Sequence, residues 1–160
     1  MKETSSHQRF MREAVRLSHE HMSAGRGGPF GAVIVRDGVV IGEGWNQVTS
    51  TCDPTAHAEV VAIRRACQAL GTHVLKGATI YSSCEPCPMC LASIYWARLD
   101  ALYFANTRID AAKIGFDDEF LYREVGLPLD RRAIPTVHLP MSEAEQVFDD
   151  WLKKPDKIPY

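Results

Sequence analysis

The stretch FGAVIVRDGVVIGEGW, Phe30–Trp45, predicts a β-hairpin. Two apolar runs flank the dipeptide Asp37-Gly38, which is a strong signal for a tight turn between antiparallel strands. After this hairpin, segments with helical spacing alternate with short apolar segments. The alternation predicts an α/β fold in which helices cover both faces of a mixed sheet, a three-layer α/β/α sandwich with about five strands.

The other elements follow from apolar spacing and from turn residues. Helical spacing predicts long helices over residues 6–24, 57–71, 89–99 and 142–154, and shorter ones over 110–116 and 119–125. Short apolar runs predict further strands over residues 78–83, 101–106 and 134–139. A chain of 160 residues with no internal repeat is most simply one domain.

Composition narrows the class of protein. Apolar residues make up 46% and charged residues 24%, with no apolar run long enough to cross a bilayer and no secretory signal, so we expect a cytoplasmic protein without a membrane partner. A formal net charge of −2 argues against nucleic acid as the partner. The five clustered cysteines indicate metal binding or catalysis rather than disulfides.

Two short motifs, His57-Ala-Glu59 and Pro86–Cys90, stand where predicted helices begin. Cys87 and Cys90 are three residues apart and share one helix face, where the positive end of the helix favours thiolates. If both helices start side by side, these thiolates and His57 can meet on one ion. One histidine and two thiolates suit Zn²⁺, and three protein ligands leave a fourth position for water. Glu59 is placed to act as the base.

Cys84 leaves a rival interpretation open. Together with His57, Cys87 and Cys90 it could complete a closed, structural Cys₃His site. The prolines that flank Cys87 restrict Cys84, and a structural site has no use for Glu59. The residues therefore favour the open, catalytic arrangement without excluding the closed one.

The motifs HAE and PCPMC together resemble the signature of the zinc-dependent nucleoside and nucleobase deaminases. The resemblance implies a cytidine deaminase-like fold. It also implies that His57, Cys87 and Cys90 bind zinc, that Glu59 shuttles a proton, and that Cys84 is not a ligand.

The resemblance extends over nearly the whole chain. The stretches GGPFGAVIVRDG and DAAKIGFDDEF and the terminal Tyr160 are similar to bacterial guanine deaminases and to plant guanosine deaminases. This implies hydrolytic deamination of guanine to xanthine and ammonia. It further implies a homodimer in which the tail, residues 152–160, packs over the partner's active site and Tyr160 closes the pocket.

The substrate contacts are less distinctive as residues. The Asn46 amide can donate and accept hydrogen bonds but also suits a turn, Phe30 suits a core, and Asp118 suits a helix start. By resemblance, Phe30 and Asn46 line the base pocket, and Asp118 contacts the base and assists the leaving amino group. Helical geometry turns Trp96 away from the metal face, which indicates a core position or a subunit contact.

Other functions fit parts of the pattern. The same chemistry could act on guanosine, on adenosine in tRNA, or on cytosine and cytidine. A zinc-stabilised interaction module without catalysis is the alternative of a different class.

Overall fold

The structure, a computed structural model, describes the backbone of residues 2–160 and the side chains from residue 6 onward. The chain forms, in order, α1 (Lys2–Ser23), β1 (Gly31–Arg36), β2 (Val39–Trp45), α2 (Val48–Thr51), α3 (Ala58–Leu70), β3 (Ala78–Cys84), α4 (Pro88–Trp96), β4 (Ala101–Asn106), α5 (Arg108–Lys113), α6 (Glu119–Val125), the 3₁₀ turn η1 (Leu129–Arg131) and α7 (Ser142–Lys153). It divides into two compact units, one up to Tyr122 and one from Arg123 to Tyr160. Among the described residues, no helix has the length and hydrophobicity that a membrane span requires.

The sheet lies in the first unit and has the strand order β2-β1-β3-β4. Strand β1 is antiparallel to both β2 and β3, whereas β3 and β4 are parallel and are joined through α4. Asp37 and Gly38 take positive φ angles of 52° and 77°, as a two-residue hairpin turn requires. The predicted hairpin and mixed sheet are confirmed.

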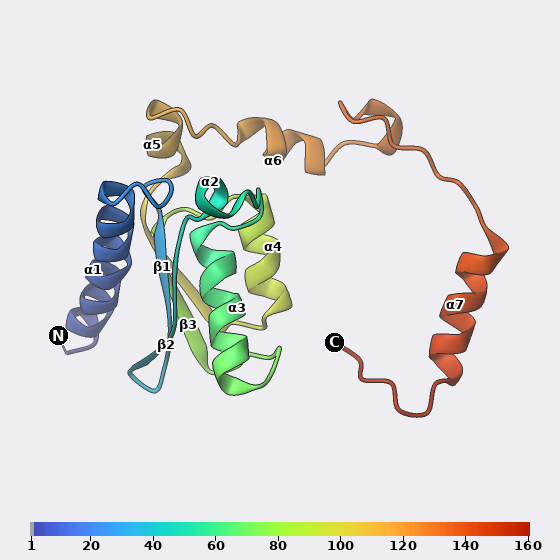
Figure 1. The fold of residues 1–160 in the computed structure, drawn as a ribbon, viewed down its shortest axis with the longest axis horizontal. Helices are drawn as coiled ribbons and strands as arrows, with labels where there is room; N and C mark the ends of the chain where they lie inside the picture. Colours follow the sequence, from blue (N-terminus) through green and yellow to red (C-terminus); the bar gives the residue numbers. More distant parts are fainter. Residues whose placement is uncertain (1) are drawn as a thin grey trace. The chain divides into compact units, whose positions relative to one another are not determined.

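Helices cover both faces of this sheet, with α1 on one side and α3 and α4 on the other (Figure 1). Strand β1 serves both layers because its side chains alternate. Val33 and Val35 pack in a cluster with residues of α1, whereas Ala32 and Ile34 pack in a cluster with residues of α3 and α4. The predicted α/β/α sandwich is therefore confirmed.

Helix α3 packs so closely on β2 that two positions of the strand must lack a side chain. A Cβ on Gly44 would lie 2.0 Å from the carbonyl oxygen of Ala58, and one on Gly42 would lie 2.6 Å from that of Ala62. Glycine within a strand commonly marks such an approach of two backbones. The contact sets where α3 begins, and therefore where His57 and Glu59 lie.

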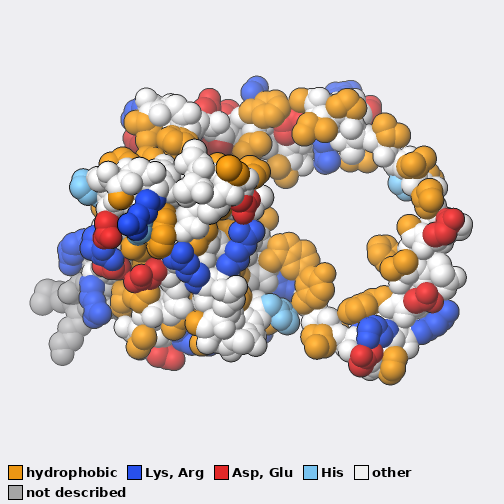
Figure 2. Space-filling view, in the orientation of Figure 1, with side chains coloured by type: hydrophobic (Ala, Val, Ile, Leu, Met, Phe, Trp, Pro, Cys, Tyr) orange, Lys and Arg blue, Asp and Glu red, His pale blue; other side chains and the backbone are white. Residues whose placement is uncertain are grey.

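The prediction of a fifth strand at residues 134–139 is wrong. The sheet has four strands, and this segment pairs with no other strand within the described chain. Ile134, Val137 and Leu139 are 77–84% exposed. A strand needs a neighbouring edge for its N–H and C=O groups, which the local apolar pattern cannot supply. Apolar side chains lie on the surface along much of the second unit (Figure 2), where α7 buries none of its residues.

Substitution of Gly44 by alanine should destabilise the first unit by about 1–3 kcal/mol, because the new methyl group would overlap the α3 backbone. Chemical denaturation would measure the loss. Gly126→Ala is the matched control, since a Cβ there meets only the Arg123 carbonyl oxygen at 3.7 Å. Equal stability of the two variants would contradict the packing argument.

Candidate functional site

Two helix starts bring three metal-binding side chains together. His57 is the N-cap of α3 and Cys87 is the N-cap of α4, and both have extended backbones with ψ of 155° and 168°. The His57 Nδ1 atom lies 3.6 Å from the Cys87 Sγ and 3.5 Å from the Cys90 Sγ. All three donor atoms lie within 4.8 Å of one another. The predicted convergence of the two motifs is thus present.

These donors suit zinc in both type and spacing. Donors bound tetrahedrally to zinc at about 2.0–2.3 Å lie roughly 3.3–3.8 Å apart, and the two measured distances fall in that range. The neighbouring side chains of Cys90 and His57 lower the pKa of Cys87 to about 4. A thiolate is therefore available at neutral pH, as metal binding requires.

Glu59 lies beside the three donors without belonging to their group. It is buried, with 6% exposure. Its Oε1 accepts a hydrogen bond from the Ser82 hydroxyl at 3.2 Å, and its Oε2 accepts one from the Cys90 thiol at 3.4 Å. Burial raises the pKa of Glu59. A carboxyl group held this way can both accept and return a proton.

Cys84 ends β3 and takes no part in the donor group. Its Sγ instead faces the carbonyl oxygen of Thr107 at 3.7 Å. Burial raises the pKa of this thiol to about 11, so it stays protonated. The arrangement differs from the closed Cys₃His alternative.

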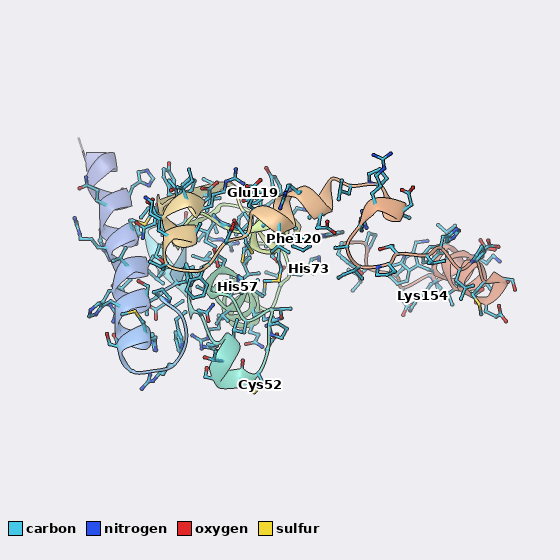
Figure 3. All side chains as sticks on the ribbon, turned by 90° about the horizontal axis from the view of Figure 1, so that it is seen from above. Cys52, His57, His73, Glu119, Phe120 and Lys154 are labelled. Carbon is cyan, nitrogen blue, oxygen red and sulfur yellow. The ribbon has the colours of Figure 1, made fainter. Side chains whose placement is uncertain are left out.

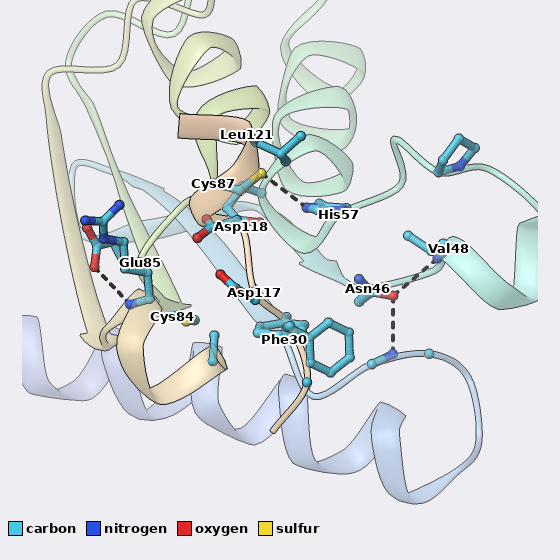
Figure 4. A pocket seen from close by; sticks show the side chains of 18 of the residues that line it. Phe30, Asn46, Val48, His57, Cys84, Glu85, Cys87, Asp117, Asp118 and Leu121 are labelled. Atoms are coloured by element: carbon cyan, nitrogen blue, oxygen red, sulfur yellow. Dashed lines mark hydrogen bonds between the residues drawn. The ribbon is translucent and has the colours of Figure 1, made fainter. Parts of the chain in front are cut away.

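A cavity of about 660 Å³ opens in front of the donors and lies within the range of small-molecule sites. It is built from the first unit (Figure 4). The side chains that line it include Phe30, Asn46, His57, Glu59, Cys84, Glu85, Cys87, Arg108, Phe116, Asp117, Asp118 and Leu121.

Phe30 and Asn46 both line this cavity. The Phe30 ring meets Phe116 edge-on, with 4.8 Å between ring centroids, so the two form an apolar wall. Asn46 is buried, and its Oδ1 accepts hydrogen bonds from the backbone N–H groups of Gly28 and Val48 at 3.2 and 3.3 Å (Figure 4). Because the oxygen is engaged, the amide NH₂ is the group that Asn46 can offer to a ligand.

Asp117 and Asp118 both line the cavity but differ in their surroundings. The Asp117 Oδ1 accepts the backbone N–H of Glu119 at 3.0 Å and so helps to start α6. Burial, followed by the nearby Cys87, raises the pKa of Asp118. Asp118 is therefore the better placed of the two for proton chemistry.

Glu85, Arg108 and Phe116 are among the lining residues that sequence reasoning missed. Glu85 lies inside the CEPCPMC stretch, and Phe116 directly precedes Asp117 and Asp118. Their position beside residues already assigned to the site could have indicated that these two residues line the cavity. Trp96 is 60% exposed, which excludes the core position and leaves the subunit contact as the prediction for this residue. Tyr160 belongs to the second unit and is 77% exposed.

Known proteins share both the motifs and the fold. The sequence pattern described as the "cytidine and deoxycytidylate deaminase zinc-binding region" matches residues 4–106. The guanine deaminase of Bacillus subtilis (strain 168) is 50% identical over 155 residues, 97% of this chain and 99% of its own. A crystal structure of guanine deaminase from Bacillus subtilis covers 96% of this chain and 98% of its own, with 50% identity and a TM-score of 0.94.

A more distant relative has a different substrate in its name. The tRNA-specific adenosine deaminase of Aquifex aeolicus is 32% identical over 126 residues, 79% of this chain and 81% of its own.

Fold, donor set and buried acid define a zinc-dependent deaminase. The chain belongs to the cytidine and deoxycytidylate deaminase family of zinc-binding enzymes.

Replacement of Cys90 by serine should remove most of the bound zinc, because a hydroxyl is a far weaker ligand than a thiolate. Cys84→Ser is the matched control and should keep the full metal content, since its sulfur faces the Thr107 carbonyl group. Metal analysis of both purified variants gives the answer. Loss of zinc from Cys84→Ser would restore the closed-site alternative.

Proposed function

We propose that this chain converts guanine and water to xanthine and ammonia. The observation that carries the proposal is the buried Glu59 carboxyl group, which lies within hydrogen-bonding distance of Cys90 in a cavity that can hold a purine. The likeness to the Bacillus subtilis guanine deaminase, at 50% identity over almost both full chains, supports guanine as the substrate.

His57, Cys87 and Cys90 would hold the zinc ion. Zinc in such a site acts as a Lewis acid that makes water nucleophilic at neutral pH. The two thiolates weaken this effect because they neutralise the formal charge of the metal, so a nearby base has a role.

Glu59 would move the protons. Its carboxylate takes a proton from the attacking water and delivers it to N3, the ring nitrogen beside C2 that carries no proton in guanine. Hydroxide adds at C2, the amino group then takes up the proton of the added hydroxyl group, and ammonia leaves as the C2 carbonyl group of xanthine forms. The raised pKa of Glu59, caused by burial, favours this return of the proton.

The remaining lining residues would recognise the base. Phe30 with Phe116 supplies a wall against which a flat ring can pack. The Asn46 NH₂ group can donate to the carbonyl oxygen at C6. Asp118 can accept from the N–H donors of guanine and assist the leaving amino group.

We further infer that the chain forms a single deaminase domain and works as a homodimer in the cytoplasm. In this dimer the tail of each subunit reaches the pocket of its partner. Val147, Phe148 and Leu152 of α7 are 63–76% exposed, and exposed apolar surface of this extent usually marks a protein contact. Trp96 offers a further apolar surface for the same dimer. All five cysteines are free, which suits a reducing compartment.

Glu59→Ala should lower kcat for guanine by at least about 10²–10⁴-fold while zinc content stays at the wild-type level, because a general acid–base group is lost and the ligands are kept. Ammonia release measures the rate and metal analysis the zinc. Unchanged turnover would leave the non-catalytic zinc module as the better description.

A separate measurement on the wild-type protein tests which substrate it uses. Ammonia release is measured with guanine, guanosine, adenine, cytosine and cytidine, and activity on guanosine alone would overturn the proposal that guanine is the substrate.

Deletion of Tyr160 should reduce turnover of guanine strongly but leave zinc content and melting temperature nearly unchanged, because the residue is proposed to close a pocket and not to build the core. Light scattering should show a dimer for the wild-type protein and for the deletion variant. Ile158→Ala, an exposed apolar residue of the same tail, is the matched control. Full activity of the deletion would show that the terminal residue has no part in the site.

A further inference from the structure

The segment that carries Asp118 has no regular secondary structure of its own. Residues 114–118 connect α5 to α6, and Asp118 directly precedes Glu119, the first residue of α6. The position of the Asp118 carboxyl group therefore depends on what ties this segment to the rest of the site.

Tyr122 makes the first tie. Its backbone N–H donates to the carbonyl oxygen of Asp118 at 3.2 Å, so the tyrosine and the aspartate move as one turn. Its hydroxyl donates to the carbonyl oxygen of Pro86 at 3.1 Å, and Pro86 directly precedes Cys87. One side chain thus connects the Asp118 turn to the turn that presents a proposed zinc ligand.

Arg108 makes the second tie. Its guanidinium group lies over the Tyr122 ring, 4.6 Å from the centroid. One of its nitrogens lies 3.2 Å from the carboxylate of Glu119. Glu119 is the first residue of α6 (Figure 3). Its backbone N–H donates to the Glu85 carboxylate at 3.0 Å (Figure 4). Both ties therefore end on neighbouring residues, Glu85 and Pro86, at the junction of β3 and α4.

The start of α5 gives this arrangement a firm base. Thr107 caps the helix, with its hydroxyl accepting the backbone N–H of Asp110 and its own backbone N–H donating to the Asp110 carboxylate. The N–H of Glu85 donates to the carbonyl oxygen of Asn106 at 2.8 Å, which joins the ends of β3 and β4. Arg108 thus projects from a capped helix that is anchored beside the site.

We propose that Tyr122, supported by Arg108, is a positioning residue that holds the Asp118 carboxyl group at the reacting purine. The inference rests on the proposed guanine deamination and deepens it. Tyr122 is not among the residues that line the cavity, so it acts on the substrate through Asp118. The half-exposed ion pair between Arg108 and Glu119 is weak by itself, so the tyrosine hydroxyl is the main tie.

Removal of the Tyr122 hydroxyl group distinguishes positioning of Asp118 from direct recognition of the substrate. Tyr122→Phe should lower kcat for guanine about fivefold to tenfold with little change in KM, because an interaction that matters in the transition state is loosened while the cavity wall is intact. Zinc content and melting temperature should stay close to wild type. Tyr95→Phe, the same change on an exposed side chain of α4, is the matched control and should leave kcat unchanged.

A double-mutant cycle tests whether the effect passes through Asp118. If Tyr122 acts by placing that carboxyl group, Tyr122→Phe should have almost no further effect on kcat in an Asp118→Asn background. A residue that touches the substrate directly would instead lower kcat by the same factor in both backgrounds.

Three outcomes would overturn the inference. One is an unchanged kcat in Tyr122→Phe, another is a full multiplicative loss in the double variant, and the third is a loss of kcat that only parallels loss of zinc or of melting temperature. Failure of the proposed function looks different: the wild-type protein would then release no ammonia from guanine, and the positioning role would fall with it.

Discussion

The close contact between the α3 backbone and strand β2 is the constraint on which the rest of the site depends. Gly44 and Gly42 leave no side chain between strand and helix, and Ala58 and Ala62 present only methyl groups on the facing turns. The helix can therefore lie directly on the sheet. Its first residues reach the end of β3, where Ser82 meets Glu59 and where the chain turns into α4.

From this contact the chemistry of the site follows in order. Two helix N-termini point at one place, and their backbone N–H groups favour anionic thiolates there. His57 and Cys87 are both N-cap residues, so their side chains extend beyond the helix ends. Glu59, the second residue of α3, is buried beside them and has a raised pKa. The proposed zinc ligands and the proposed proton carrier, Glu59, are therefore neighbours because two helices start together.

The residues proposed to select the substrate lie on different elements from the metal-donor group. The donor group comes from α3 and α4, whereas Phe30, Asn46 and Asp118 come from the strand ends and from the α5–α6 connection.

Much of this arrangement could be predicted from the sequence because it rests on local signals. Asp37-Gly38 between apolar runs determines a hairpin, and helical spacing after His57 and Cys87 determines two helix starts. The closed alternative with Cys84 could not be decided that way, since only the fold turns that sulfur toward Thr107. The ties from Arg108 and Tyr122 to the Glu85–Pro86 turn join residues far apart in the chain. The prediction of a fifth strand was wrong for a related reason. An apolar pattern indicates that a segment suits a sheet, but a strand forms only where another backbone offers hydrogen bonds. Local sequence determined the elements and the types of ligand, and tertiary packing decided which side chains meet.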